Sequence, residues 1–501
     1  MSLIGLDIGT TGCKAIIFHI DGRIAGQAAR EYPIQTPHYG WAEQDAELVF
    51  SSAMSALREA LNHAGGLRPV ALSLSCQGEA VMPVDTAGKS MAPVILGMDT
   101  RTIAENRWLD EQFGAENLYR RTGMPMHTVN TLPKLLWFKT HRAEVWKSAD
   151  QFLLYEDFFI RRLCGRAFIS PCLASRTQMV DLHGGEWMED VLERCGIEAS
   201  RLATIAPAHG AVGVILPQTA DQWGIPRGLM VYAGGHDQAC AALGAAIYSP
   251  GKAMVSTGTA EVIEVVLERP IVHADLAAGG ISVYRHVIPN RYLAMTLNHS
   301  GGLSLRWYRD QFASFELQQS HAGKGDAYDI LLRDAGDSPT DLFVLPHFSG
   351  SGTPILDTKS RGAILGLTFA ATKAQVAKAI LEGLTFELRM NIERLRSVGI
   401  AVELLHAVGG GAKSDLWLQL KADICRLPIS KPRHTEAACL GAAILAGVGH
   451  GVYADTASAV DNVLQLEKSF APNQQNASLY EERFKRYQLI YPMLKDFYHQ
   501  W

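Results

Sequence analysis

An acidic residue follows two glycines near the middle of the 501-residue chain, in the run Gly234-Gly235-His236-Asp237-Gln238. The apolar segment 229–233 before it is typical of a buried strand, and the small residues after it favour a helix. Sites in α/β proteins commonly lie at such strand-to-helix junctions, so Asp237 could act there as a general base. It could equally cap the helix, and this segment alone leaves both readings open. His236 is interpreted first as a structural hydrogen-bonding residue.

A second candidate lies at the N-terminus, where Asp7 interrupts an apolar run and Gly9-Thr10-Thr11-Gly12 follows. Turn residues between two apolar runs predict a β-hairpin, and backbone N–H groups at its tip could hold phosphate oxygens. Lys14 could add a positive charge toward the phosphates. A carboxylate in an apolar strand is unfavourable unless it is paired, so Asp7 is a candidate for holding a metal ion. The alternative is a surface hairpin with a solvated Asp7.

A glycine run, Gly409-Gly410-Gly411, separates an apolar segment at 404–408 from a helical pattern at about 414–426. Such a loop allows a nucleotide to lie against bare backbone at a helix N-terminus. A tight connection without a ligand explains the run equally well. The chain has no Walker sequence that would decide the matter.

Hydrophobic periodicity predicts the elements that must position these residues. Strands are expected at the N-terminal hairpin, after Asp21-Gly22, and at 69–75, 341–346 and 404–408. Helices are expected at 46–63, 373–395, 414–426, 436–447 and beyond 474. This alternation favours an α/β fold with helices covering the sheets. A second hairpin at 251–266 has a similar Gly/Thr tip, which suggests two related domains, 1–247 and 248–501, joined near the turn at 248–251.

Composition narrows the class of protein. Hydrophobic residues make up 48% and charged residues 19%, which suits a globular protein with two cores. The net charge of -5 and the absence of a basic block argue against nucleic acid as a partner. The eight cysteines lack metal-ligand spacing, as expected in a reducing compartment. Without a signal peptide or an apolar stretch longer than 437–449, the protein is expected to be cytoplasmic, with no membrane partner.

Taken together, these motifs resemble the FGGY carbohydrate kinases over almost the whole chain. The segment 362–367, followed after seven residues by 375–382, matches the second signature of that family, and 131–141 nearly matches the first. The sequence departs from the first signature at Val129, where the family prefers an aromatic or small residue. The N-terminal hairpin resembles the phosphate hairpin of the family, and 256–259 resembles a second phosphate-contacting turn.

The resemblance implies two actin-like ATPase (ribonuclease H-like) domains, with ATP in the cleft between them and the sugar bound deeper. It implies that Asp237 deprotonates the substrate hydroxyl and that Mg²⁺ bridges the phosphates near Asp7, through water. The implied ATP contacts are Gly9, Thr10, Thr11, Lys14, Gly258, Thr259, Gly302, Arg306, Gly410, Gly411 and Asp415. The implied sugar contacts are Gln77, Gly78, Glu79, Asp99, Arg101, His236, Asp237 and Gln238.

The sugar itself is less clearly indicated. Gly78 and Glu79 stand where glycerol kinases carry Arg-Glu and xylulokinases carry Met-His, and Val129 replaces a substrate-contacting tyrosine. We interpret Glu79 as an acceptor for two adjacent hydroxyls and Gly78 as space for a larger sugar; a solvent-facing Glu79 is the alternative. Glycerol is therefore disfavoured, and a ketopentose such as xylulose, a related ketose or a four- to six-carbon polyol is expected.

Two other functions stay open at this stage. One is an ATPase of the actin-like fold that hydrolyses ATP without a sugar, and the other is a catalytically inactive sugar-binding regulator. A homodimer is expected only by analogy with the family.

Overall fold

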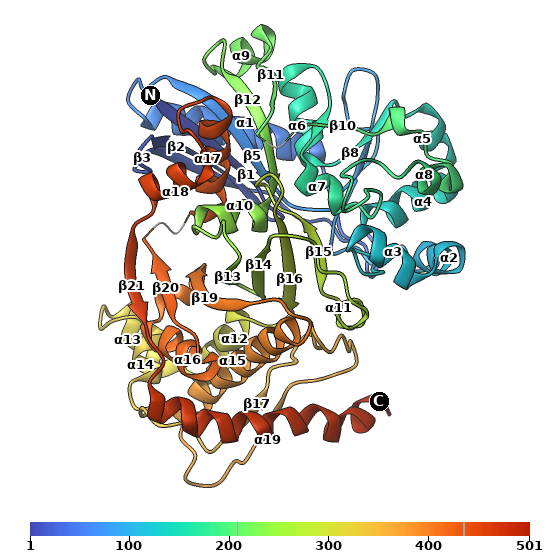
Figure 1. Cartoon of the computed structure of the whole chain (residues 1–501). Helices are drawn as coiled ribbons and strands as arrows, with labels where there is room; N and C mark the ends of the chain where they lie inside the picture. The colour runs from blue at the N-terminus through green and yellow to red at the C-terminus, as the bar shows by residue number, and fades with distance from the viewer. Residues whose placement is uncertain (208, 434–435, 501) are drawn as a thin grey trace.

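The computed structural model describes residues 1–207, 209–433 and 436–500. It contains two large mixed β-sheets, each flanked by helices, and Figure 1 shows the first sheet above the second. Among the described residues, none of the helices combines the length and apolarity that a membrane crossing requires.

The first sheet has the strand order β11-β12-β5-β1-β2-β3. Strands β1 (Ser2–Ile8), β2 (Gly12–His19) and β3 (Ile24–Glu31) form an antiparallel meander. Strands β5 (Pro69–Cys76) and β12 (Met230–His236) continue it in parallel with β1, and β11 (Ala211–Val214) forms the antiparallel edge. The predicted meander and the strand expected at 69–75 are therefore confirmed.

The second sheet repeats this plan in the order β15-β16-β14-β13-β19-β20-β21. Its antiparallel part consists of β13 (Gly251–Thr257), β14 (Glu261–Leu267) and β16 (Tyr292–Asn298). Strand β19 (Val402–Val408) pairs in parallel with β13, and β20 (Ile429–Pro432) pairs in parallel with β19. Strands β15 (Ser282–Arg285) and β21 (Leu466–Phe470) are the edges. Two halves with one topology agree with the expectation of related domains, whose boundary at 247/248 stays a prediction.

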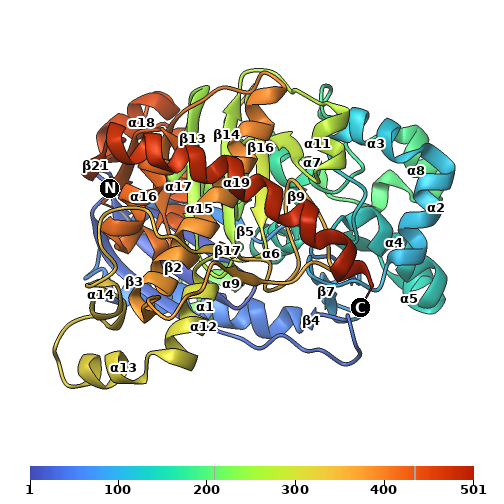
Figure 2. The same cartoon turned by 90° about the horizontal axis from the view of Figure 1, so that it is seen from below.

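Helices begin close to the predicted positions because capping side chains precede them. Helix α1 (Ala46–His63) is capped by Asp45, α15 (Lys373–Ser397) by a capping box at Thr372, and α16 (Asp415–Cys425) by Ser414. The terminal helix α19 (Gln474–His499) lies across the underside of the second half, as Figures 1 and 2 show. The shorter strand β17 (Phe343–Leu345) lies inside the strand expected at 341–346.

Helix α17 (Ala437–Gly449) lies between β20 and β21 of the second sheet in sequence but packs against β1 and β5 of the first (Figure 1). Glycines make this close approach possible. A Cβ at Gly5 would lie 1.9 Å from the carbonyl oxygen of Cys439, and one at Gly441 would lie 1.8 Å from that of Cys240. The apolar stretch at 437–449 is therefore a buried helix that ties the two halves together.

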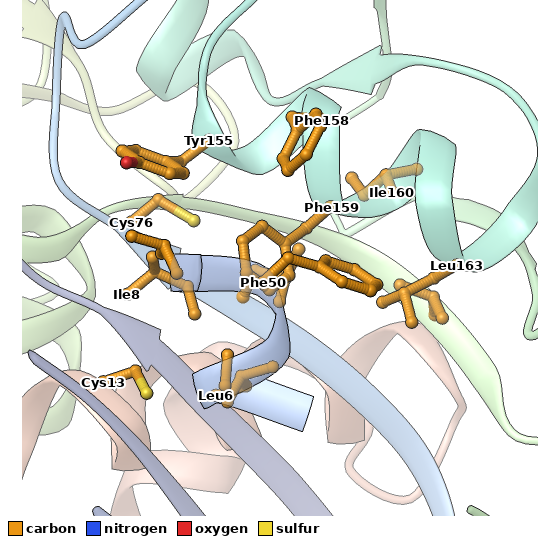
Figure 3. Close-up of a cluster of buried hydrophobic side chains, with 14 of the residues drawn as sticks. Leu6, Ile8, Cys13, Phe50, Cys76, Tyr155, Phe158, Phe159, Ile160 and Leu163 are labelled. Atoms are coloured by element: carbon orange, nitrogen blue, oxygen red, sulfur yellow. The ribbon is translucent and has the colours of Figure 1, made fainter. Parts of the chain in front are cut away.

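The core of the first half fixes the direction of each strand side chain. Leu6 and Ile8 of β1 pack with Phe50 of α1 and with residues of α6 (Tyr155–Cys164), as Figure 3 shows. Leu3 instead belongs to the cluster that contains α17. Because successive strand residues point to opposite faces, Asp7 shares the face of Leu3 and points toward α17.

Candidate active site

A cavity of about 760 Å³ opens between the two halves at the carboxyl ends of the first sheet's parallel strands. From the first half it is lined by Thr10 of the hairpin, by Gln77-Gly78-Glu79 after β5, and by His236-Asp237-Gln238 at the start of α10 (Asp237–Gly244). The second half closes it with side chains that include Val262, Ser282, Met295, Leu297 and His299. Several predicted sugar contacts and one predicted phosphate contact thus share one space.

Asp237 is the first residue of α10, and the N-cap position belongs to His236. The Asp237 Oδ1 atom accepts a hydrogen bond from the Gln238 amide at 2.6 Å and lies 3.1 Å from His236 Nε2. Burial, together with the nearby charge of Asp7, raises the pKa of Asp237 to about 7. Burial holds the pKa of His236 well below its usual value, so this imidazole is neutral. A carboxyl group that titrates near neutrality suits a general base.

Asp7 lies beside Ser75 of β5 in the parallel register, and Ser75 Oγ donates a hydrogen bond of 2.6 Å to its Oδ1. Burial raises the pKa of Asp7 to about 6. The ion-pair partner of Lys14 is Glu436 and not Asp7: the Lys14 Nζ atom lies 2.6 Å from a carboxylate oxygen of Glu436. Glu436 directly precedes α17. The phosphate contact expected of Lys14 stays a prediction.

Glu79 is buried, at 4% exposure, and its backbone adopts a left-handed φ of 58°. Its partner is Arg176, also 4% exposed, whose Nε donates to Glu79 Oε1 at 2.5 Å. The alternative of a solvent-facing Glu79 is therefore wrong. Sequence reasoning missed Arg176, which follows the short helix α7 (Pro171–Ser175) without any motif of its own.

Gly78 does provide space, but protein side chains use it. A Cβ at this position would lie 2.9 Å from His236 Cδ2 and 3.2 Å from Arg176 Nε. The interpretation that Gly78 leaves room for a larger sugar is corrected accordingly. The missing side chain allows His236 and Arg176 to approach the loop after β5.

Asp99 and Arg101 are both described and lie outside the cavity lining, although residues on either side of Asp99 belong to it. The Arg101 Cζ atom lies 3.6 Å from the ring centre of Trp41 and 4.7 Å from that of Trp137. It also pairs with Asp99 at 2.6 Å and with Glu43 at 2.8 Å. This geometry favours a structural role in shaping the loop, and the predicted sugar contact of both residues stays untested.

The predicted nucleotide residues converge at the carboxyl end of β13. The Gly302 amide donates to the carbonyl oxygen of Gly258 at 2.8 Å, and the Gly301 amide donates to that of Thr259 at 2.9 Å. A Cβ at Gly411 would lie 2.7 Å from the Thr257 side chain. A Cβ at Gly258 would meet no described atom within 4 Å, so this turn offers an open face of backbone.

The remaining nucleotide-side predictions lie around these turns. Arg306 is in the first turns of α12 (Gly302–Phe312), and Gly410 begins a short 3₁₀ segment, Gly410–Lys413. Asp415 begins α16, and its carboxylate pairs with Lys468 at 2.6 Å. These positions surround one region, and contact of each residue with a nucleotide remains a prediction.

A buried ion pair that sequence reasoning missed supports the second hairpin. Lys421 of α16 donates to Thr257 Oγ1 at 2.7 Å and pairs with Glu261, and both charged side chains are 1% exposed. Because an unpaired buried charge is strongly destabilising, the pair holds α16 against the hairpin. It therefore fixes the distance between the 258–259 turn and the glycine run.

Comparisons with known proteins match both halves of the chain. The family model for the N-terminal domain of the FGGY family of carbohydrate kinases matches residues 2–244, and the model for the C-terminal domain matches residues 253–450. The chain is 30% identical to a xylulose kinase of Bacillus subtilis, across 99% of this chain and 97% of that protein. It is 28% identical to a gluconokinase of the same species, across 95% and 93%. The crystal structure of a xylulose kinase from Rhodospirillum rubrum superposes with a TM-score of 0.90 at 25% identity, covering 100% of both chains.

Proposed function

The chain belongs to the FGGY family of carbohydrate kinases, and from that premise we propose that it phosphorylates a ketose, with a xylulose-like ketopentose favoured, using Asp237 as the base. One observation carries this proposal. The partly buried carboxylate of Asp237 and Thr10 of the phosphate hairpin line the same cavity. A base and a phosphate-holding turn must meet across the substrate hydroxyl in phosphoryl transfer.

In this reaction the hydroxyl oxygen of the sugar bonds to the γ-phosphorus of ATP, and Asp237 accepts the proton that this hydroxyl loses. The bond between that phosphorus and the bridging oxygen breaks, and ADP keeps its electron pair. The raised pKa of Asp237, about 7, makes its carboxylate basic enough to share this proton at neutral pH. The neutral His236 beside it orients the carboxylate without adding a competing positive charge.

The residues on the nucleotide side fit the phosphates of ATP. The amides of Gly9 and Gly258 donate within their own turns, to the carbonyl oxygens of Gly12 and Ala260, each at 2.9 Å. The remaining N–H groups of the two turns could hold phosphate oxygens, and no side chain at Gly258 blocks their approach. The glycine run lies against Thr257, close enough that no side chain could separate them. We assign Gly9, Thr10, Thr11, Gly258, Thr259, Gly302, Arg306, Gly410, Gly411 and Asp415 to this nucleotide region.

Mg²⁺ is the metal that we assign to the site, held by Asp7 through water. Among the described residues no group of three or more His, Cys, Asp or Glu side chains forms a cage for a metal. A single carboxylate suits Mg²⁺, which keeps several waters and binds through one or two carboxylates together with substrate phosphates. Bound there, the ion would neutralise charge on the phosphates. The hydrogen bond from Ser75 would hold the Asp7 carboxylate in place when the ion is bound.

Two further assignments accompany this function. The halves correspond to an N-terminal, sugar-binding domain at 1–247 and a C-terminal, nucleotide-binding domain at 248–501. We also propose a homodimer by analogy with the family, and its test is the mass in solution.

The test is ATP consumption by the purified full chain with Mg²⁺ and a panel of ketoses, polyols and aldonates. We expect turnover that requires a sugar and is greatest with a ketopentose. Sugar-independent hydrolysis of ATP would identify an ATPase of the same fold, and ligand-induced thermal stabilisation without turnover would identify a binding protein. Either result would overturn the proposal.

A further inference from the structure

The guanidinium of Arg176 is only partly satisfied by the protein. Its Nε and Nη2 atoms engage Glu79 Oε1, and among the described residues the hydrogen-bond partner of Nη1 is the thioether sulfur of Met295 at 3.4 Å. A thioether is a weak acceptor. Because Arg176 lines the cavity, Nη1 retains a strong donor for a substrate oxygen.

The carboxylate of Glu79 is satisfied on one side only. Among the described residues, Oε1 receives the hydrogen bond from Arg176, and Oε2 receives none. Oε2 lies next to the cavity wall, since a Cβ at Gly97 would be 3.7 Å from it and 3.5 Å from Val129 Cγ2. Glu79, Gly97 and Val129 all line the cavity. Oε2 is therefore an acceptor that a substrate hydroxyl can reach.

The pair is also held in place from the other half of the molecule. The Arg176 guanidinium lies 4.5 Å from the ring centre of Tyr284 in β15, and Tyr284 donates a hydrogen bond of 2.8 Å to the buried Glu264 of β14. Met295 belongs to β16 of the same sheet. A guanidinium fixed on three sides presents its free donor in one direction, which is the condition for selective recognition.

We infer that Arg176 and Glu79 form a donor–acceptor couple that selects an α-hydroxy ketone, with Nη1 donating to the carbonyl oxygen and Oε2 accepting from the adjacent hydroxyl. The inference rests on the proposed function and specifies its substrate class. Nη1 can only donate a hydrogen bond, and a carbonyl oxygen can only accept one, so the two are complementary. In the corresponding polyol that oxygen is a hydroxyl, whose own hydrogen would face the arginine and the thioether without a strong acceptor.

Aldonates are disfavoured by charge. Arg176 is already neutralised by Glu79, so a substrate carboxylate would meet a net neutral pair with a free carboxylate oxygen in a buried position. The carboxylate of the substrate and that of Glu79 carry like charges, which repel strongly where water is excluded. The couple therefore distinguishes a ketose from the gluconate that related kinases act upon.

The test compares kcat/KM for xylulose and xylitol, which differ only at the carbonyl carbon, and for gluconate. The wild-type protein should prefer xylulose to xylitol by at least about tenfold, the scale of one unsatisfied buried hydrogen bond. In the double variant Glu79→Gln/Arg176→Met, which leaves no lone buried charge, this ratio should fall toward one. In Glu79→Gln alone, the freed guanidinium should raise the gluconate-to-xylulose ratio at least about tenfold.

A matched control is the double variant Glu261→Gln/Lys421→Met, which removes the other buried pair on the nucleotide side. It should change KM for ATP and leave the xylulose-to-xylitol ratio as in the wild type. Arg176→Lys is the second variant if the double variant fails to fold; it keeps the charge, lacks the forked donors, and should lower the ratio. An active kinase without ketose preference, or a ratio that survives removal of the couple, would overturn the inference. Absence of turnover with every sugar would instead overturn the proposed function.

Discussion

The two sheets share one strand plan but end in different residue types. In each, three antiparallel strands are continued by two parallel ones, β1-β5-β12 in the first and β13-β19-β20 in the second. At the carboxyl ends the first sheet carries Asp7, Ser75 and Asp237, whereas the second carries Thr257, Gly258 and the run 409–411. The carboxyl groups of the first set can accept a proton or carry a negative charge, whereas the glycines of the second set expose main-chain atoms.

Under the proposed function, this difference lets one topology serve two substrates. Burial at these strand ends raises the pKa of Asp237 to about 7, which suits proton transfer, and that of Asp7 to about 6. Glycines at the corresponding ends of the second sheet let a ligand approach main-chain N–H groups. We therefore expect substitutions in the first set to change chemistry and those in the second to change nucleotide affinity.

Asp237→Asn should have the largest effect. The amide keeps the size of the side chain but cannot accept the hydroxyl proton, so kcat should fall at least about 100-fold, the scale for loss of a general base. KM for the sugar and for ATP should change little. Steady-state kinetics with both substrates provides the measurement, and turnover like that of the wild type would remove Asp237 from the catalytic step.

The pH dependence should locate the same group. Because the pKa of Asp237 is raised to about 7 and the base must be ionised, log kcat/KM should fall with a slope of about one as pH decreases below about 7. Asp7, with a pKa of about 6, should steepen the decline at lower pH. A flat profile from about pH 5.5 to 8 would contradict the assignment, and the residual activity of Asp237→Asn should lack the inflection near 7.

Two glycines of the second set should separate folding from nucleotide binding. In Gly411→Ala the new methyl would lie 2.7 Å from Thr257 and 3.0 Å from Trp417, so the protein should lose about 1–3 kcal/mol of stability through overpacking. In Gly258→Ala the methyl meets no described atom within 4 Å, so the melting temperature should not change. If phosphate fills that space, KM for ATP should still rise at least about fivefold, equal to about 1 kcal/mol of crowding.

These glycine variants need both readouts. Thermal melting without ligand reports on packing, and KM for ATP at saturating sugar reports on the nucleotide. A Gly258→Ala protein with unchanged KM for ATP would place the phosphates elsewhere. A stable Gly411→Ala protein would show that the Thr257 side chain can move aside.

The elements of the site could be predicted from local sequence because each has a clear period and a cap, as at Asp45, Thr372 and Ser414. Contacts between distant segments could not. Arg176 lies 97 residues beyond Glu79, and no local pattern indicates that the two form a pair. The space at Gly78 was visible in the sequence, but only the fold shows that His236 and Arg176 use it.

The smallest effects are expected at Lys14, which belongs to the first hairpin but pairs with Glu436, the residue before α17. The two side chains are 36% and 29% exposed, and a pair so accessible contributes about 0–1 kcal/mol to stability. Lys14→Met and Glu436→Gln should therefore lower the free energy of unfolding by similar small amounts. If Lys14 also contacts a phosphate, Lys14→Met should raise KM for ATP about threefold, within the same energy range.

Glu436→Gln is the control that separates the two roles of Lys14. It removes the competing partner and leaves the ammonium free to turn toward phosphate, so KM for ATP should stay constant or decrease. An equal increase in KM for ATP in both variants would show that the pair acts only by holding the hairpin to α17. Lys14 would then only connect the first hairpin to α17. Phosphate binding would depend on the backbone of the two hairpin turns.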